Sequence, residues 1–159
     1  MKQNETDIKF MALALEEARA AMGRKEVPIG AVVVSDGTVI GRGHNLKESS
    51  DDPTAHAEIV AIKEAAKQQK SWRLAEATIY VTLEPCLMCM GAIIQARLCR
   101  VVFASFDPKA GACGSLYDVS NDPRLNHSVE VASGISDSES KALLQGFFSE
   151  LRQRKKKEK

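Results

Sequence analysis

The sequence predicts one α/β domain in which helices cover both faces of a β-sheet. Short β-branched runs, typical of strands, alternate along the chain with segments whose apolar residues recur every three or four positions, as in helices. With 159 residues, of which 44% are hydrophobic, the chain is long enough for one hydrophobic core. We therefore expect a single domain over 1–159. Its basic C-terminal tail, roughly 153–159, is either disordered and solvated or a phosphate-binding segment.

The first third of the chain is typical of a helix followed by a hairpin. Asp7 is a candidate N-cap, and Gly23 suits the end of this helix. The apolar stripe of the helix is Ile8, Met11, Leu15, Ala18 and Met22. Residues 31–34 are a β-branched strand, the Asp-Gly pair at 36–37 predicts a tight turn, and 38–43 form the returning strand.

The middle of the chain predicts two helices on either side of a strand. Thr54 is a candidate cap for a helix that runs to about Gln69, and Trp72 after it is expected to anchor the packing. The inward face of that helix is expected to hold Ile59, Ile62 and Ala66. Residues 77–82 form a third strand. The next helix, which begins near Pro85, is apolar nearly all round and is therefore expected to be buried between layers.

The last third predicts two strands, a long loop and a helix. The strands are at 101–104 and 129–132. Between them lies 107–126, which is too long for an idle connection and is a candidate substrate loop. The C-terminal helix begins near Asp137, with an apolar stripe of Leu143, Leu144, Phe147, Phe148 and Leu151.

Two motifs predict a zinc site that carries its own acid/base group. Glu58 follows His56 by two residues, and Cys86 and Cys89 lie one helical turn apart. A helix beginning just before Cys86 points both sulfurs the same way, and its N-terminus favours thiolates. Three ligands are typical of a catalytic zinc, which leaves the fourth tetrahedral position for water of lowered pKa. Glu58 is then placed to take the proton of that water and pass it to a leaving group.

Two other interpretations of these motifs fit the sequence less well. A redox Cys-x-x-Cys pair has no need of His-x-Glu upstream. A structural zinc closes its shell with a fourth Cys or His. The remaining candidates show no ligand spacing: Cys99, Cys113, His44 and His127. We expect the two spare cysteines to be small, buried apolar residues.

The composition argues against a membrane protein and against a disulfide scaffold. No apolar run is long enough for a membrane span, and the polar residues at 3–7 are unlike a signal peptide. Four cysteines, two of them assigned to zinc, suit a reducing cytoplasm. The net charge of +1 is uninformative as a total, but the end of the chain is strongly basic.

Several short motifs, spread over nearly the whole chain, match one known family. The His-x-Glu and Pro-Cys-x-x-Cys motifs are typical of zinc nucleobase deaminases. Asp107-Pro108-Lys109 and Leu125-Asn126-His127 narrow the match further. Other matching segments are 26–31, His44-Asn45, Thr54-Ala55, Thr82-Leu83-Glu84, Gly91-Ala92-Ile93 and Gly114-Ser115. In these motifs the chain resembles the bacterial tRNA-specific adenosine deaminases, a family of the cytidine deaminase superfamily.

This resemblance implies both an architecture and a reaction. The implied fold is a cytidine deaminase-like, three-layer α/β/α domain with a five-stranded mixed sheet. The implied assembly is a homodimer with one zinc ion per subunit. The implied substrate is the anticodon stem-loop of a tRNA, in particular an arginine tRNA. Its wobble adenosine would become inosine when activated water attacks C6 of the purine and Glu58 transfers the protons.

The resemblance also assigns residues to the target base. Asn45 carries an amide that can donate and accept, which suits a purine edge, although an Asn here could also cap a loop. Backbone groups of Ala57 and of Leu83 or Glu84 are expected to flank the base. Pro28 and Ile29 are expected to form an apolar wall, although pure core packing would give the same pattern.

Other residues are expected to contact the RNA. Asp107 could accept a hydrogen bond from a ribose 2′-hydroxyl and so distinguish RNA from DNA, whereas the sequence without the resemblance favours a turn residue before Pro108. The remaining candidate RNA contacts are Lys109, Asn126, Phe148 and Arg152. The two cations would bind phosphates, and the phenylalanine would receive a splayed nucleotide unless it packs the helix onto the sheet.

Two rival functions remain to be distinguished. A small-molecule deaminase of the same superfamily, acting on guanine, cytidine or a deoxynucleotide, would have no use for Asp107-Pro108-Lys109 or a basic terminus. A non-catalytic zinc domain that only binds RNA would have no use for a complete His-x-Glu motif without a fourth ligand.

Overall fold

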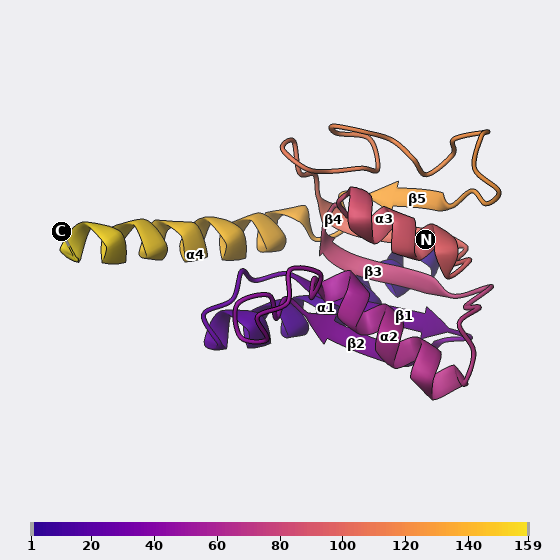
Figure 1. Cartoon of the computed structure of the whole chain (residues 1–159), viewed down its shortest axis with the longest axis horizontal. Coiled ribbons are helices and arrows are strands. Elements are labelled where there is room, and N and C mark those ends of the chain that lie inside the picture. Colours follow the sequence, from indigo (N-terminus) through magenta and orange to yellow (C-terminus); the bar gives the residue numbers. More distant parts are fainter. Residues whose placement is uncertain (1, 159) are drawn as a thin grey trace.

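The computed structural model describes residues 2–158, and its helices and strands alternate as the sequence predicts (Figure 1). In chain order they are α1 (Lys2–Gly23), β1 (Gly30–Ser35), β2 (Thr38–His44), α2 (Ala57–Gln69), β3 (Thr78–Leu83), α3 (Leu87–Gln95), β4 (Arg100–Ser105), β5 (Glu130–Ser133) and α4 (Asp137–Lys157). None of the described helices is long and apolar enough to cross a membrane.

The strands form a five-stranded mixed sheet in the order β2-β1-β3-β4-β5, as expected. β1 runs antiparallel to β2 and β3, whereas β3, β4 and β5 are parallel. Because Leu83 pairs with Ser105, β3 and β4 end side by side. The segments that follow them, from Glu84 and from Phe106, therefore start at the same edge of the sheet.

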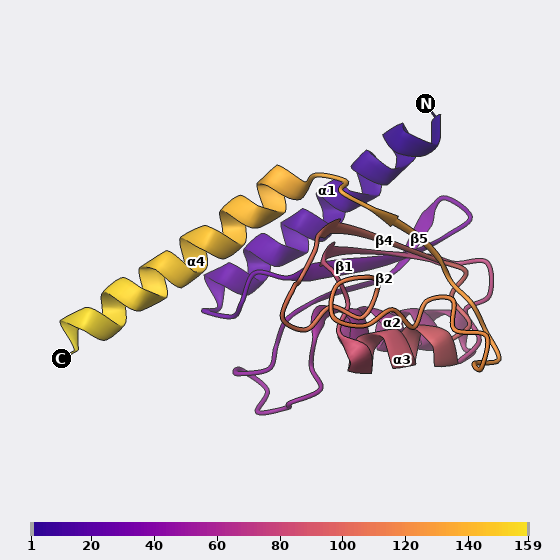
Figure 2. The ribbon, with the colours of Figure 1, turned by 90° about the horizontal axis from the view of Figure 1, so that it is seen from above.

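The helices lie in two layers, one on each face of the sheet. α1 and α4 lie together on one face, and α2 and α3 lie together on the other (Figure 2). The hydrophobic core is divided accordingly. One cluster fills the space between the sheet and α2 and α3, and the other fills the space between the sheet and α1. The three-layer expectation is confirmed.

α2 lies very close to β2 because the strand carries glycines. A Cβ atom at Gly43 would stand 2.6 Å from the carbonyl oxygen of Ala57, and one at Gly41 would collide with the next turn of the helix. Only small side chains fit between such closely packed elements. The buried hydrophobic face of α2 is therefore Ala57, Ala61 and Ala65. Of the predicted inward face, Ile62 is half-buried and packs against the core, whereas Ile59 and Ala66 are half-buried outside it.

Asp7 is a buried core residue rather than a helix cap. α1 begins before it, and Asp7 accepts hydrogen bonds from both terminal nitrogens of Arg100, each at 2.8 Å, and from the Tyr80 hydroxyl at 2.9 Å. Burial raises the pKa of the Asp7 carboxyl, but these hydrogen bonds outweigh burial and hold the pKa below its usual range. The prediction of a cap was wrong because Asp7 binds partners on β3 and β4.

Other local predictions also need correction. Thr54 does not cap α2, because its backbone N–H and hydroxyl both donate to Asp52 Oδ1, at 2.8 and 2.7 Å. Trp72 is 61% exposed and anchors no core, and Cys99 is exposed. Residues 153–157 are exposed but helical, so this part of the tail is not disordered.

Candidate active site

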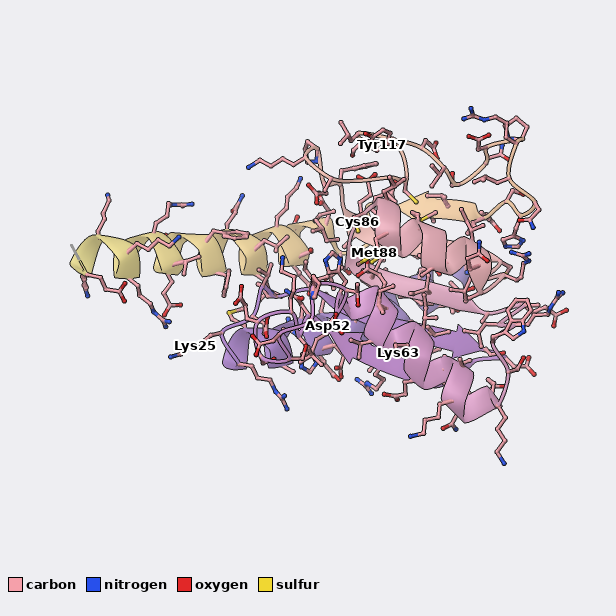
Figure 3. All side chains as sticks on the ribbon, in the orientation of Figure 1. Lys25, Asp52, Lys63, Cys86, Met88 and Tyr117 are labelled. Carbon is pink, nitrogen blue, oxygen red and sulfur yellow. The ribbon has the colours of Figure 1, made fainter. Side chains whose placement is uncertain are left out.

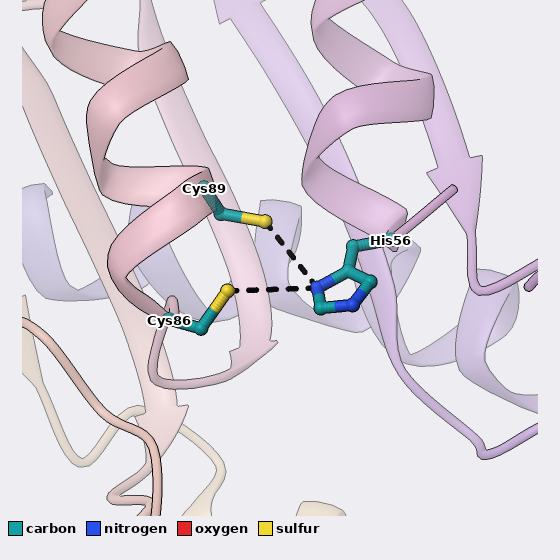
Figure 4. A group of neighbouring side chains, drawn as sticks. All are labelled: His56, Cys86 and Cys89. Atoms are coloured by element: carbon teal, nitrogen blue, oxygen red, sulfur yellow. Dashed lines mark hydrogen bonds between the residues drawn. The ribbon is translucent and has the colours of Figure 1, made fainter. Parts of the chain in front are cut away.

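The two predicted motifs meet where α2 and α3 begin. His56 and Cys86 are the N-cap residues of these helices, and both have extended backbone conformations. Neither side chain caps its own helix. Both side chains are consequently free to point into the space between the two helix N-termini, where they face each other (Figure 4).

His56, Cys86 and Cys89 have the geometry of a metal site. His56 Nδ1 lies 3.6 Å from Cys86 Sγ and 3.5 Å from Cys89 Sγ (Figure 4). A tetrahedral ion with metal–sulfur bonds of about 2.3 Å and a metal–nitrogen bond of about 2.0 Å requires a nitrogen–sulfur separation of about 3.5 Å. The three ligand atoms lie within 4.8 Å of one another, so they could hold a metal ion with little rearrangement.

The electrostatics of the three residues also suit a cation. The hydrogen bond with Cys89 is the largest influence on Cys86 and, with a further hydrogen bond from His56, lowers the pKa of its thiol to about 4. The same contact, together with burial, raises the pKa of Cys89. One sulfur is thus a thiolate at neutral pH, and a metal ion would displace the proton of the other.

Glu58 is the buried carboxyl group of the site. It lies in the first turn of α2, is 4% exposed, and lines the same cavity as His56. Burial, which disfavours the charged form, raises the pKa of this carboxyl to about 7. A carboxyl group sequestered in this way is a candidate for proton transfer.

The cavity beside the three metal-site residues has a volume of about 200 Å³. The predicted site residues that line it are Ile29, Asn45, His56, Ala57, Glu58, Glu84, Cys86 and Asp107. Pro28 is buried next to this lining but is not part of it. Lys47 also lines the cavity and was not predicted. Its only signal in the sequence is its position two residues after Asn45.

Asn45 both caps its loop and lines the cavity. Its side-chain oxygen accepts a hydrogen bond from the backbone N–H of Lys47 at 3.3 Å, as in a loop cap. The residue is 7% exposed and lines the cavity. The loop contact fixes the orientation of the amide, so the two interpretations are compatible.

The side chain of Glu84 organises the loop after β4, which the sequence did not indicate. Its carboxylate accepts hydrogen bonds from the backbone N–H groups of Asp107 and Cys113, both at 2.9 Å, and of Ser115 at 3.1 Å. The Ser115 hydroxyl donates as well. Glu84 is 2% exposed, and its carboxylate occupies the space that a Cβ at Gly111 would need. Sequence reasoning considered only the backbone of this residue.

Asp107 forms a turn, as the sequence predicts when the family resemblance is left aside. Its Oδ1 accepts the backbone N–H groups of Lys109, at 3.1 Å, and Ala110, at 3.3 Å. The residue also lines the cavity. The turn therefore places this carboxyl group at the wall of the cavity.

Three other predicted residues gather in a second depression, and one remains apart. Lys109, Phe148 and Arg152 line a depression of about 400 Å³ where α4 passes the 107–110 turn. Asn126 is exposed and lines neither hollow. Its neighbour His127 hydrogen-bonds the carbonyl of Leu98 at 2.7 Å, close to the start of β4 and so at the opposite edge of the sheet. Within one chain, Asn126 does not reach the cavity.

Comparison with known proteins places this site among deaminases. A profile of the MafB19-like deaminase family matches residues 5–152. The tRNA-specific adenosine deaminase of Bacillus subtilis is 48% identical over 150 residues, which cover 94% of this chain and 93% of that protein. The tRNA-specific adenosine deaminase of Haemophilus influenzae is 46% identical over 158 residues, 99% of this chain and 91% of that protein.

Solved structures give the same result. A structure from a study of A-to-I editing by tRNA:A34 deaminases at the wobble position of transfer RNA has a TM-score of 0.83 and 48% identity. The match covers 86% of this chain and 99% of the solved chain. The guanine deaminase of Nitrosomonas europaea has a TM-score of 0.74 and 26% identity, over 88% and 83% of the two chains. The fold thus occurs in relatives that act on different bases.

Proposed function

The chain belongs to the family of tRNA-specific adenosine deaminases, and from this premise we propose that it hydrolyses the wobble adenosine of a tRNA anticodon to inosine. The observation that carries the proposal is the convergence of His56, Cys86 and Cys89 beside a cavity that also contains the buried carboxyl group of Glu58. A metal-ligating triad, a sequestered acid/base and room for a base are the parts that hydrolytic deamination needs.

We propose zinc as the metal, with one ion per subunit. Two thiols and an imidazole are ligands that zinc prefers, and three protein ligands are typical of its catalytic sites. His56, Cys86 and Cys89 would hold the ion. A zinc ion in this position supplies Lewis-acid chemistry, which makes water a nucleophile near neutral pH.

Glu58 is the proposed acid and base. It accepts one proton from the attacking water and delivers it to N1 of the purine. It then takes the second proton from the hydroxyl group on C6 and passes it to the amino group, which leaves as ammonia while C6 becomes a carbonyl. Its position at the start of α2, beside His56 and against the cavity, supports this role because the carboxyl group is within the same hollow as the ligands. Its burial keeps bulk water from competing for the proton.

The cavity wall supports a single flipped-out adenine. We propose that the amide of Asn45 contacts the edge of the purine and that backbone groups of Ala57 and Glu84 flank it. Ile29 supplies an apolar wall, with Pro28 buried behind it. A base that must enter such a hollow has to leave its stack, which favours an unpaired anticodon nucleotide as substrate.

Contacts at the wall of the cavity and beyond it would select RNA. We propose that Asp107 accepts the 2′-hydroxyl of a ribose and that Lys109, Phe148 and Arg152 receive the flanking nucleotides in the second depression. Arginine tRNA as the substrate and Asn126 as an RNA contact remain proposals that rest on the family resemblance.

A homodimer is proposed on the basis of an apolar surface that α2 and α3 leave open. α3 was predicted to be buried between layers, but Leu87 is 52% and Met88 is 37% exposed, because α3 packs on the sheet with one side only. Between the two helices lies an open apolar depression of about 430 Å³ that Ile62 and Trp72 help to line. A surface of this kind favours a second copy as its partner. The cysteines, all free thiols, are compatible with the proposed cytoplasmic location.

The test is an inosine assay on the zinc-loaded protein. An arginine-tRNA anticodon stem-loop with a wobble adenosine is compared with free adenosine, cytidine and guanine, and Glu58→Ala is the matched control that should keep its zinc. Conversion of the stem-loop alone supports the proposal. Turnover of guanine or a nucleoside instead would assign the chain to small-molecule deaminases. Binding of the stem-loop without any inosine would favour a non-catalytic RNA-binding domain.

A further inference from the structure

Seven of the 22 lysine and arginine residues of this protein lie at one end of the molecule. The distal part of α4 carries Arg152 and Arg154 followed by three lysines at 155–157, and the turn after α1 adds Arg24 and Lys25. We call these seven residues the basic end. Two carboxylates accompany them: Glu150, which pairs with Arg154 at 2.9 Å, and Glu158, the C-cap of α4. Since the whole chain has a net charge of +1, seven cations against two carboxylates leave the rest of the chain at a net −4.

Local helix stability explains only part of this concentration. Cations at the C-terminus of a helix interact favourably with its dipole, which accounts for their sign on α4. It does not account for Arg24 and Lys25, which belong to a different segment. Lys25 and Arg154 nevertheless line the same small depression between α1 and α4, and Figure 3 shows Lys25 at the end of the molecule toward which α4 projects.

Three separate hollows relate the candidate active site to the basic end, because the first and second are lined by the 107–110 turn and the second and third by α4. Asp107 lines the cavity, and Lys109 in the same turn lines the second depression together with Arg152. Leu151 and Arg154, which lie on either side of Arg152 in the sequence, line a third depression together with Lys25. α4 then projects beyond the sheet on the side where the loop before α2, which lines the cavity, also lies (Figures 1 and 2).

α4 is fixed firmly at its start. The Ser105 hydroxyl donates to the Asp137 carboxylate at 2.8 Å, and the Ser140 hydroxyl donates to the carbonyl of Thr82 at 2.6 Å. Ser105 and Ser140 are both 1% exposed. The helix therefore presents its distal cations at a defined position relative to the ends of β3 and β4, where the cavity begins.

We propose that the basic end binds the phosphates of the anticodon stem while the loop enters the active site. This inference rests on the proposed function and extends it, because it gives the substrate a second contact beyond Arg152. At a rise of 1.5 Å per residue, the segment from Arg152 to Lys157 is about 8 Å long, which corresponds to the axial rise of about two phosphates along one strand at about 3.4 Å each. The stem is a duplex and would be recognised through its backbone, independent of its sequence.

The test measures binding as a function of salt. The variant K155Q/K156Q/K157Q removes three exposed charges. K9Q/K67Q/K70Q, with substitutions on α1, on α2 and at the C-cap of α2, is the control with the same change in net charge. Binding of the zinc-loaded protein to a labelled anticodon stem-loop is followed by fluorescence anisotropy between low and moderate salt. The same loop on a shortened stem is the second ligand.

We expect the slope of log affinity against log salt to fall in magnitude by about 2 to 3 in the α4 variant, at about 0.9 per lost phosphate contact. Affinity for the full stem falls about tenfold or more at low salt, whereas affinity for the shortened stem and kcat at saturating RNA stay as in the unmodified chain. Equal slopes for the α4 variant and its control would overturn the proposal. Inosine formation by the unmodified chain is scored separately, so failure of this inference is distinct from failure of the proposed function.

Discussion

Replacing Glu84 with glutamine tests whether one buried carboxylate positions the loop that reaches from the cavity toward the RNA. The glutamine has nearly the same shape, but one of its two oxygens becomes an NH2 group that cannot accept a hydrogen bond. Of the two orientations of the glutamine amide, the less damaging one places the NH2 group where Oε1 now accepts from the Asp107 N–H and the Ser115 hydroxyl. The hydroxyl can rotate and accept a hydrogen bond instead, so only the Asp107 N–H loses its acceptor. The N–H groups of Cys113 and Ser115 keep a neutral acceptor.

The magnitude follows from this geometry. One buried N–H donor without an acceptor costs about 1 to 3 kcal/mol, and two hydrogen bonds that lose their charged acceptor cost about 1 kcal/mol each. The total of about 3 to 5 kcal/mol corresponds to a fall in Tm of about 10 °C for a chain of this size. Because the lost donor belongs to Asp107, we also expect KM for the stem-loop to rise while zinc content stays the same.

The assay combines thermal unfolding, zinc content and inosine kinetics, with Glu64→Gln as an exposed control. Ser115→Ala, which removes only the hydroxyl contact, gives a milder version of about 1 kcal/mol if Glu84→Gln does not fold. An unchanged Tm and an unchanged KM in Glu84→Gln would refute the reasoning.

Four further predictions follow from the structure. The depressed pKa of Asp7 means that its ion pair contributes full stability above its ordinary value of 3.8 and loses it as the pH falls through the lower pKa of the folded state. The difference in unfolding free energy between the unmodified chain and Asp7→Asn should therefore shrink toward pH 2, and a constant difference would exclude this ion pair as the cause. Gly43→Ala inserts a methyl group against the α2 backbone, so we expect a loss of about 1 to 3 kcal/mol in urea unfolding together with weaker zinc retention; unchanged stability would contradict the close packing. Cys86→Ala should lose zinc, measured by metal analysis, whereas Glu58→Ala should retain zinc and lose at least about a hundredfold in rate; a Cys86→Ala protein that keeps full zinc would remove it from the ligand set. Leu87→Glu should shift the protein from dimer to monomer in light scattering, and an unaltered dimer would move the interface elsewhere.

The parts of the fold that the sequence predicted correctly are those set by short-range spacing. The Asp-Gly pair at 36–37 forms the turn between β1 and β2, with positive φ at both residues. Cys86 and Cys89 point the same way because they are one helical turn apart, and His-x-Glu places its two side chains at the start of one helix. The identities of the metal-site residues therefore needed no tertiary information.

Burial was harder to predict, because an apolar pattern does not say which face meets which layer. This ambiguity explains why the burial of residues on α2 and on α3 was predicted incorrectly. The isoleucines of α2 were the natural candidates for its contact with the sheet, but glycines on β2 bring the strand so close that alanines occupy this contact and Ile62 is only half-buried at the side of the core. α3 is apolar on all sides, yet it lies in an outer layer and exposes Leu87 and Met88.

By itself, the sequence determined the α/β class, the order of elements, the metal-site residues and the acid/base carboxyl, because each depends on residues that are neighbours along the chain. Only the tertiary structure decided that Asp7 pairs with Arg100, that Glu84 holds the 107–115 loop, and that Asn126 lies away from the cavity. The partners in these contacts are separated by 23 to 93 residues. A polar side chain acquires its partner only when the sheet order brings such distant segments together, and no local pattern encodes that order.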